Sequence, residues 1–448
     1  MPLDKNALHT VEITGYTSEG EGVTRIDGQV IFVKGAILGE VCVIRILKTS
    51  KTIAWAKIEE IVSPSPHRIA PLCPVYGPCG GCDFLHMAYE EELRLKHARV
   101  VDALTRVGGL DVPVAPIVAD DRQSHYRNKA IFAVGSGPVT GFYRRRSHEI
   151  VPAPNCLIQK ESASCAAAAL CDWIAAHDIS VYEKSTRKGL IRHLFVRQSE
   201  CSGDTAICVV STSAALPRQD ALIETLRCHC PEASSITLCV NSDPGNVVLQ
   251  GEFRTLWGSD YLEDTLSGLS FRLSPQSFFQ VNPPQAERLY EQACTYAGLT
   301  GRETVLDLYC GTGTITLVMA RHAGRVIGAE IVTEAVRDAR ENAQRNGIEN
   351  AEFLPADAAD AASALRNRGL SPDVIVIDPP RKGLAPEVIG HMAELAPCRI
   401  VYVSCDPATL SRDLNRLADC GYVAKEVTPV DMFPRCAHVE CVALLERV

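Results

Sequence analysis

Apolar and polar positions follow two different patterns along the chain, and the change falls near residue 300. Beyond it, near-continuous apolar runs of strand length alternate with helical segments, as in TVLDLY (304–309), DVIVIDPP (373–380) and RIVYVSCD (399–406). Unbroken apolar strands separated by helices are typical of a parallel sheet that helices cover on both faces. We therefore predict a doubly wound, Rossmann-like α/β domain at this end of a multidomain α/β chain.

The N-terminal part has a strand pattern instead. Residues 8–62 read as short alternating strands separated by glycine turns, which predicts a small β-barrel of the kind that often binds oligonucleotides. The proline-containing stretch 63–71 marks its end, and mixed strands and helices from about 120 to 265 predict an α+β domain. The predicted division is a barrel at 1–62, a central α+β domain at 63–265 and the α/β domain at 266–448. A helix around 89–107 is expected to be able to pack against the last of these.

Composition narrows the class of protein. The chain has 448 residues, of which 46% are hydrophobic and 22% charged, which is ordinary for a soluble globular protein. No apolar run approaches the roughly 18 residues of a membrane-spanning helix, and the N-terminus has no apolar core of signal-peptide type. We expect a cytoplasmic protein with no membrane partner. The sequence leaves the oligomeric state open, with a monomer expected.

Charge is distributed unevenly. The net charge of -9 disfavours a nucleic-acid partner when the chain is taken as a whole. Residues 122–148 and 184–197, however, carry several arginines and lysines and no acidic residue. Two such segments are the footprint expected of phosphate binding, although solvated basic loops would give the same pattern.

A ligand crevice is predicted where the strands of the α/β domain end. The first strand runs into a turn that contains Gly311 and Gly313, which lets a ligand approach the backbone closely. Acidic residues stand at or near the ends of successive strands and are expected to line this crevice: Asp307, Glu330, Asp357 and Asp378. A dinucleotide enzyme would prefer a third glycine where the chain has Thr316. The acidic turn suits a cationic ligand without phosphate, such as S-adenosylmethionine, better than a pyrophosphate.

A thiol stands at the same edge of the predicted sheet. Cys405 follows the strand RIVYVS, and a thiolate that adds to C6 of uracil makes C5 able to attack a sulfonium methyl group. A base must then remove the C5 proton, and Glu440 is the candidate. Methyl transfer to nitrogen would need no such thiol. A structural role for Cys405, or a packing role for His438, is the alternative at this point.

A cysteine-rich loop predicts a metal centre. Cys73, Cys79 and Cys82 lie in the short segment PLCPVYGPCGGCDF, and Cys156 follows far along the chain. Four thiolates suit a tetrahedral zinc ion or an iron–sulfur cluster. Spacing alone leaves both possible, together with a metal-free loop.

With these residues in view, nearly the whole chain resembles the RNA uracil-5-methyltransferase family, in particular the iron–sulfur branch that modifies 23S ribosomal RNA. Residues 1–62 look like its TRAM RNA-binding barrel, and SPQSFFQVN (274–282), YVSCDPATLSRD (402–413) and HVE (438–440) match its motifs. The resemblance implies S-adenosylmethionine as cofactor, Cys405 as nucleophile and Glu440 as base. It implies cofactor contacts by Gln280, Tyr309, Glu330, Asp378 and Asp357, and a 4Fe–4S cluster on Cys73, Cys79, Cys82 and Cys156.

The resemblance leaves some points open. Cys436 stands where family members often have threonine, and its thiol is the weaker hydrogen-bond donor. Transfer RNA is an alternative substrate, and an RNA-binding iron–sulfur assembly factor without activity is an alternative function. The target uridine must leave its base stack to reach Cys405. Three aromatic residues are expected either to stack on a base or to belong to the core: Phe278, Phe279 and Phe433.

Overall fold

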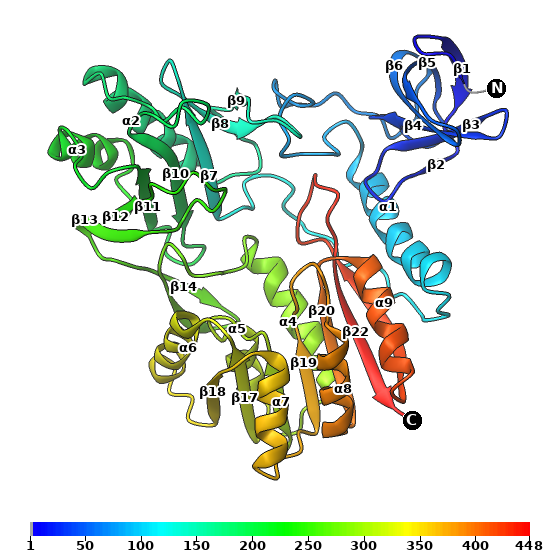
Figure 1. Cartoon of the computed structure of the whole chain (residues 1–448), viewed down its shortest axis with the longest axis vertical. Helices are drawn as coiled ribbons and strands as arrows, with labels where there is room; N and C mark the ends of the chain where they lie inside the picture. Colours follow the sequence, from blue (N-terminus) through cyan, green and yellow to red (C-terminus); the bar gives the residue numbers. More distant parts are fainter. Residues whose placement is uncertain (1–2) are drawn as a thin grey trace.

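The N-terminal strands pair into one sheet in the order β1-β5-β6-β4-β3-β2. In the computed structural model, which describes residues 3–448, this sheet forms a small body at one end of the molecule (Figure 1). Alternate side chains such as Ile31, Val33 and Ile44 are fully buried inside it. Its strands are β1 (Leu8–Glu12), β2 (Gly15–Tyr16), β3 (Gly22–Ile26), β4 (Gln29–Lys34), β5 (Val41–Thr49) and β6 (Ile53–Ser63).

The central part of the chain builds a seven-stranded sheet in the order β13-β12-β11-β10-β7-β8-β9. Helices α2 and α3 cover one face of it with an alanine- and leucine-rich surface around Trp173. The elements are β7 (Lys129–Gly135), β8 (Val139–Tyr143), β9 (Ile150–Pro152), α2 (Glu161–Ala176), β10 (Ile191–Gln198), β11 (Thr205–Ser211), α3 (Gln219–His229), β12 (Ala233–Val240) and β13 (Glu252–Gly258). A hairpin of β14 (Leu262–Leu266) and β15 (Leu269–Leu273) leads into the last part of the chain.

The C-terminal part is a seven-stranded sheet in the order β18-β17-β16-β19-β20-β22-β21. Its first five strands are parallel, and β22 pairs antiparallel with β20 and β21. The doubly wound α/β fold predicted from the apolar runs is confirmed. The elements are α4 (Pro283–Ala297), β16 (Thr304–Leu308), α5 (Thr314–Ala320), β17 (Arg325–Glu330), α6 (Thr333–Arg345), β18 (Ala351–Pro355), α7 (Ala358–Asn367), β19 (Val374–Ile377), α8 (Pro386–Leu395), β20 (Arg399–Ser404), α9 (Pro407–Ala418), β21 (Tyr422–Val430) and β22 (Glu440–Arg447).

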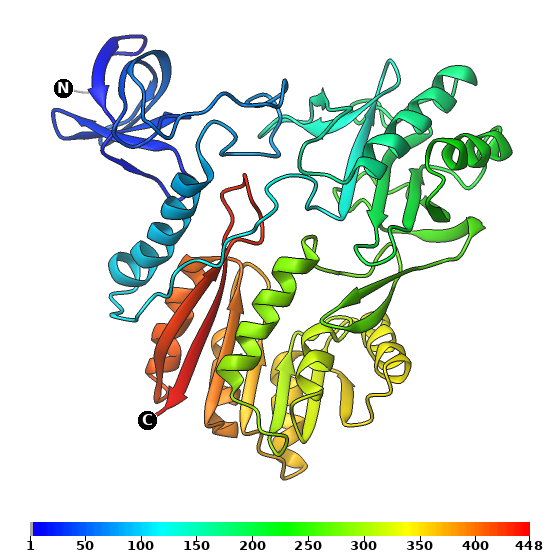
Figure 2. The ribbon, with the colours of Figure 1, turned by 180° about the vertical axis from the view of Figure 1, so that it is seen from behind.

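Helices cover both faces of this sheet, as its apolar strands require. Helices α4, α5 and α6 share one hydrophobic core with one face, and α7, α8 and α9 share a second core with the other (Figures 1 and 2). No helix within residues 3–448 is long and apolar enough to cross a bilayer.

The helix that follows the first sheet packs on the C-terminal body. It consists of α1 (Tyr89–Asp102) and a π-helical turn η1 (Ala103–Val107). Val100 and Leu104 belong to the core that contains α9, and the Asn415 side chain donates a hydrogen bond to the Gly108 carbonyl at 2.8 Å. A Cβ at Gly108 would lie 2.0 Å from Ser411 Oγ, so this close approach requires glycine. In Figure 1, α1 runs from the first sheet alongside α9.

A buried ion pair fixes the first sheet to the segment that leaves it. Glu40 is fully buried, and Arg68 contacts both of its carboxylate oxygens, at 2.5 and 2.7 Å. Breaking a buried pair leaves an uncompensated charge, so we predict that Arg68→Met destabilises the sheet by about 3 kcal/mol. Native-state hydrogen exchange of the β4 and β6 amides measures this change. The control is Lys57→Met, because Lys57 pairs with Glu59 on the exposed surface; equal effects of the two variants would contradict the prediction.

Candidate active site

The strand order brings three candidate residues to one edge of the C-terminal sheet. Asp378 follows β19, Cys405 follows the neighbouring β20, and Glu440 begins β22. Because β22 runs antiparallel to β20 and Ser404 pairs with Cys441, the next positions along the two strands are Cys405 and Glu440. A thiol and two carboxyl groups from three separate stretches of sequence therefore meet where the parallel strands end.

The turn after β20 holds Cys405 at this edge. The Asp406 carboxylate accepts hydrogen bonds from the backbone N–H groups of Ala408 and Thr409, both at 2.9 Å, and so caps α9. Pro407 occupies the first turn of the helix, where no backbone donor is needed. The strand therefore gives way to the helix directly after Cys405, which leaves this half-buried thiol at the mouth of the site.

The glycine turn after β16 forms another part of the edge. Tyr309, Gly311 and Gly313 all have positive φ angles, of 68°, 55° and 84°. The Gly311 N–H donates to the Glu330 carboxylate at 3.2 Å, and a Cβ at Gly311 would meet no atom within 4 Å. This side of the turn is open to a ligand. Asp307 is buried inside β16 and accepts a hydrogen bond from Thr316 at 2.5 Å, so its carboxylate lies beneath the turn and its place in the crevice lining stays a prediction.

The segment before α4 lies against this turn. Thr312 Oγ1 donates to the Phe278 carbonyl at 3.5 Å, and Gln280 lies beside Tyr290, whose hydroxyl is 3.0 Å from Thr314 Oγ1. Phe279 is buried in the core and so has the core role that was one of its two expected roles, whereas 64% of the Phe278 side chain is exposed. The structure thus brings Gln280 to the glycine turn.

Asp357 lies at the far side of the crevice, directly after β18. It is exposed, and its carboxylate accepts a hydrogen bond from the Asp360 N–H at 2.8 Å to cap α7. A capping role explains its local geometry without a ligand.

The site has an acidic electrostatic character. Burial raises the pKa of Asp378 to about 7. Burial, with a smaller contribution from Asp378, raises the pKa of Glu440 to about 8. Burial, followed by Glu440 and Asp378, raises the pKa of the Cys405 thiol to about 11, and Arg381 opposes the rise at both Cys405 and Glu440. Such a cluster favours a cationic ligand, because a positive charge stabilises the ionised form of all three groups.

Arg381 was missed in the sequence. It follows Asp378-Pro379-Pro380 directly, and its guanidinium lies 3.2 Å from Nε2 of His438, near the base candidate. Its position after an acidic strand end was the signal that could have identified it.

The four candidate metal ligands line one cavity of about 330 Å³. Burial, and then the proximity of the Cys79 and Cys73 thiols, raises the pKa of Cys156. Within residues 3–448, no group of three or more His, Cys, Asp or Glu side chains has an arrangement that would hold a single metal ion.

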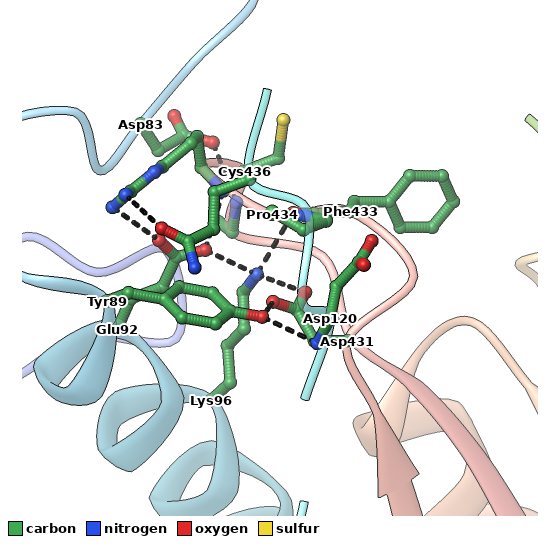
Figure 3. Close-up of polar contacts among 12 residues, drawn as sticks. Asp83, Tyr89, Glu92, Lys96, Asp120, Asp431, Phe433, Pro434 and Cys436 are labelled. Carbon is green, nitrogen blue, oxygen red and sulfur yellow. Dashed lines mark hydrogen bonds and ion pairs between the residues drawn. The ribbon is translucent and has the colours of Figure 1, made fainter. Parts of the chain in front are cut away.

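The segment 431–439, which delivers Glu440, is held by buried charges (Figure 3). Lys96 of α1 is fully buried, and its ammonium lies 2.7 Å from Glu92 and 2.6 Å from Asp431. It also donates to the Phe433 carbonyl at 3.0 Å, while Glu92 accepts from the Arg435 N–H at 2.6 Å. No local pattern indicates this role, because a lysine four residues after a glutamate is typical of an exposed helix.

Comparison with known proteins identifies the family. A family model described as tRNA (Uracil-5-)-methyltransferase matches residues 251–448, and a TRAM domain model matches residues 7–58. An uncharacterized RNA methyltransferase of Clostridium tetani is 42% identical over 448 residues, which cover 99% of this chain and 97% of that protein. The chain belongs to the RNA uracil-5-methyltransferase family. An uncharacterized RNA methyltransferase of Caldanaerobacter subterraneus is likewise 42% identical, over 98% of each chain.

A solved structure agrees over the same length. The chain is similar to Pyrococcus abyssi tRNA (uracil-54, C5)-methyltransferase in complex with S-adenosyl-L-homocysteine, with a TM-score of 0.80 and 26% identity. The match covers 97% of this chain and 99% of that one. This uracil-5-methyltransferase family member is therefore an S-adenosylmethionine-dependent RNA methyltransferase with an N-terminal TRAM domain.

The acidic cluster predicts a pH-dependent preference for the sulfonium cofactor. A cation favours ionised Asp378 and Glu440, so binding S-adenosylmethionine expels protons when these groups are still protonated. Its affinity should fall about tenfold as the pH drops from 8 to 6, through the pKa values of about 8 and 7, and should level off above them. Calorimetric titration should find a much flatter profile for S-adenosylhomocysteine, whose sulfur is neutral. Parallel profiles for the two ligands would contradict the electrostatic account.

Proposed function

We propose that this enzyme methylates C5 of a uridine in RNA, with Cys405 as covalent nucleophile and Glu440 as base. The observation that carries the proposal is the meeting of these two residues on paired strands beside Asp378. C5 of uracil is too weak a nucleophile to take a methyl group unaided. An enzyme that transfers a methyl group to C5 of uracil therefore needs a thiol that adds to C6 and a base that removes the proton from C5.

Cys405 starts the reaction. Its thiol loses its proton to solvent, and its sulfur then forms a bond to C6 while the C5=C6 electrons move to C5. The pKa of about 11 means that the thiol is protonated at neutral pH before substrates bind, and Arg381 is the cation that favours the thiolate. S-adenosylmethionine, when bound, would supply the methyl group to C5, with its S–CH3 bond breaking to leave neutral S-adenosylhomocysteine.

Glu440 completes the reaction. Its carboxylate removes the proton from C5, the electrons of that C–H bond restore the C5=C6 double bond, and the C6–S bond breaks to return Cys405 as thiolate. A pKa of about 8 makes Glu440 a stronger base than an exposed carboxylate and keeps it near its ionisation point at neutral pH. Gln280, Tyr309, Gly311, Gly313, Glu330, Asp378 and Asp357 are proposed to bind the cofactor.

The proposed substrate is 23S ribosomal RNA. The support is the cysteine loop, which resembles that of the family branch acting on this RNA. Transfer RNA is the second candidate, because the similar Pyrococcus abyssi enzyme is named for uracil-54 of tRNA. Methylation assays with both unmodified RNAs decide between them, and label appearing only in transfer RNA would overturn the first choice.

We also propose that Cys73, Cys79, Cys82 and Cys156 hold a 4Fe–4S cluster. The donor set fits, because all four thiols line one cavity of about 330 Å³. Four thiolates would suit a zinc ion as well, and the resemblance to the iron–sulfur branch is what favours the cluster. Methyl transfer is redox-neutral, so the cluster would hold the cysteine loop in place and supply no electrons to the reaction.

Two variants test the covalent mechanism. Cys405→Ala should abolish methyl transfer to RNA, because it removes the thiol proposed to activate C5. Glu440→Gln should form the adduct but resolve it at least about a hundredfold more slowly, so that a protein–RNA conjugate accumulates on denaturing gels. The matched control is Cys420→Ala, which removes an exposed thiol of the same α/β body. Methylation by the Cys405→Ala protein, or rapid turnover without conjugate by the Glu440→Gln protein, would refute the assigned roles.

Metal analysis tests the cluster without reference to activity. Protein purified without oxygen should contain about four iron and four sulfide per chain, and Cys82→Ala should lose most of both. Cys201→Ala, which removes an exposed thiol elsewhere in the central part, should retain them. Stoichiometric zinc in place of iron would contradict the proposal.

A further inference from the structure

The two cationic segments noted in the sequence meet at a second cavity, away from the cysteines. This cavity of about 380 Å³ lies on the central sheet, between the turn that follows β8 and the loop 181–184. Tyr143 and His148 of the segment 122–148 line the cavity. Lys184 and His193 of the segment 184–197 line it from the other side, together with Tyr182. The ammonium of Lys184 lies 3.4 Å from Nε2 of His148, so the two segments are in contact here.

Several of the predicted cations are engaged elsewhere. Arg144 pairs with Glu149, Arg145 with Asp83 and Arg122 with Glu200. Lys184 and the buried Arg192 are the cations of the lining, beside Glu183, whose carboxylate accepts hydrogen bonds from Ser185. The other contact of Lys184 is the Asn246 amide oxygen at 2.9 Å.

The cavity wall also offers unused hydrogen-bonding groups. Among the described residues, His193 Nδ1 and Arg192 Nε are buried and have no hydrogen-bond partner, whereas Nη1 of Arg192 donates to the Asn241 and Asp243 carbonyls at 2.6 and 2.7 Å. Burial, followed by the charges of Arg192 and Lys184, lowers the pKa of His193 to about 4, so its ring is neutral at pH 7 and can accept a hydrogen bond. Arg192 is 95% buried and aligned over the Tyr182 ring at 4.7 Å.

We propose that this cavity binds one unpaired nucleotide of the RNA substrate, remote from the uridine that is methylated. Tyr143, Tyr182 and His148 supply flat faces for a base, His193 and Arg192 supply polar groups for its edge, and Lys184 meets its phosphate. Backbone contacts through the cysteine loop connect the cavity wall to the segment that delivers Glu440. The Gly80 N–H of the cysteine loop donates to the Tyr143 carbonyl at 3.2 Å, and the same loop contacts the segment that delivers Glu440. This inference rests on RNA being the substrate.

A charge-reversal pair tests the subsite. In a Cys405→Ala background, which separates binding from chemistry, Lys184→Glu should weaken binding of a 23S ribosomal RNA transcript about tenfold. Lys188→Glu makes the same charge change four residues away, on an exposed residue that does not line the cavity, and should have less than about a twofold effect. Equal losses of RNA affinity in the two variants would show that only general surface charge matters and would overturn the proposal.

Ultraviolet cross-linking of the same complex gives an independent readout. Peptides carrying Tyr143, His148 or Tyr182 should be linked to a nucleotide, and Tyr143→Leu should remove most of that signal. Cross-links that map only to the TRAM domain and the α/β body would contradict the subsite. Failure of the proposed methylation would leave these binding measurements interpretable, since they need no turnover.

The buried network of Figure 3 carries a second, independent inference. Lys96 and Glu92 come from α1, whereas their partners Asp431, Phe433 and Arg435 lie in the segment before Glu440. Arg435 has a positive φ of 71°, which is uncommon for a residue with a side chain, so this conformation must be imposed by its contacts.

Further bonds extend the network to residues 274–282, the segment proposed to bind the cofactor through Gln280 and called the cofactor segment below. Tyr89 donates to Asp431 at 2.7 Å and accepts from the Asp120 N–H at 2.9 Å. Asn282, two residues after Gln280, donates to Asp120 at 2.6 Å and to the Met432 carbonyl at 3.2 Å. The same buried charges thus connect α1, the cofactor segment and the base segment.

We infer that Lys96 is a positioning residue for Glu440, an inference that rests on Glu440 being the base. Lys96→Met should lower kcat about tenfold or more by displacing the base. A displaced base slows adduct resolution more than adduct formation, so conjugate should accumulate as in Glu440→Gln. The matched control is Lys425→Met, which makes the same side-chain change at an exposed ion pair of the C-terminal body and should leave adduct formation and turnover unchanged.

The outcomes separate the two claims. Conjugate in Glu440→Gln but not in Lys96→Met would overturn the positioning role alone, whereas no conjugate in either would refute Glu440 as base. Should Lys96→Met fail to fold, Tyr89→Phe removes only the hydrogen bonds of one hydroxyl and should show the same shift towards conjugate to a smaller degree. If the Tyr89→Phe protein turns over more slowly but accumulates no conjugate, the positioning role of the network is contradicted as well.

Discussion

The active site depends on one feature of strand pairing. Five strands of the C-terminal sheet are parallel, so their ends meet at one edge, and β22 then enters antiparallel beside β20. This reversal places the beginning of β22 at the edge where β20 ends. Cys405 and Glu440 therefore lie together although 35 residues separate them in the sequence. A parallel strand in the same place would carry Glu440 to the opposite end of the sheet.

The segment before Glu440 receives support from three directions. Lys96 and Glu92 hold it from α1, and Asn282 holds it from the cofactor segment. The cysteine loop contributes as well, because the N–H groups of Asp83 and Phe84 donate to the Arg435 carbonyl at 2.8 and 3.1 Å. Desolvated charges are expensive unless paired in good geometry. Their concentration here is consistent with a segment whose position matters for the reaction.

The sequence predicted what local pattern and strand position can encode. Apolar runs gave the α/β fold, and strand ends gave Asp378 and Cys405, because such positions meet at one edge in any parallel sheet. Lys96 escaped prediction because its partner Asp431 lies 335 residues away. The positive charge of the two cationic segments was overestimated for the same reason. Arg145 pairs with Asp83 and Arg122 pairs with Glu200, and both acids lie outside the segments.

The central claim is that a bond forms between Cys405 and C6 of the target uridine. RNA in which 5-fluorouridine replaces uridine tests it most directly, since Glu440 has no C5 proton to remove and the adduct cannot resolve. After incubation of the unmodified enzyme with this RNA and S-adenosylmethionine, mass spectrometry of the digest should find the Cys405 peptide linked to a methylated 5-fluorouridine. The absence of any conjugate, or a conjugate through a different cysteine, would contradict the account.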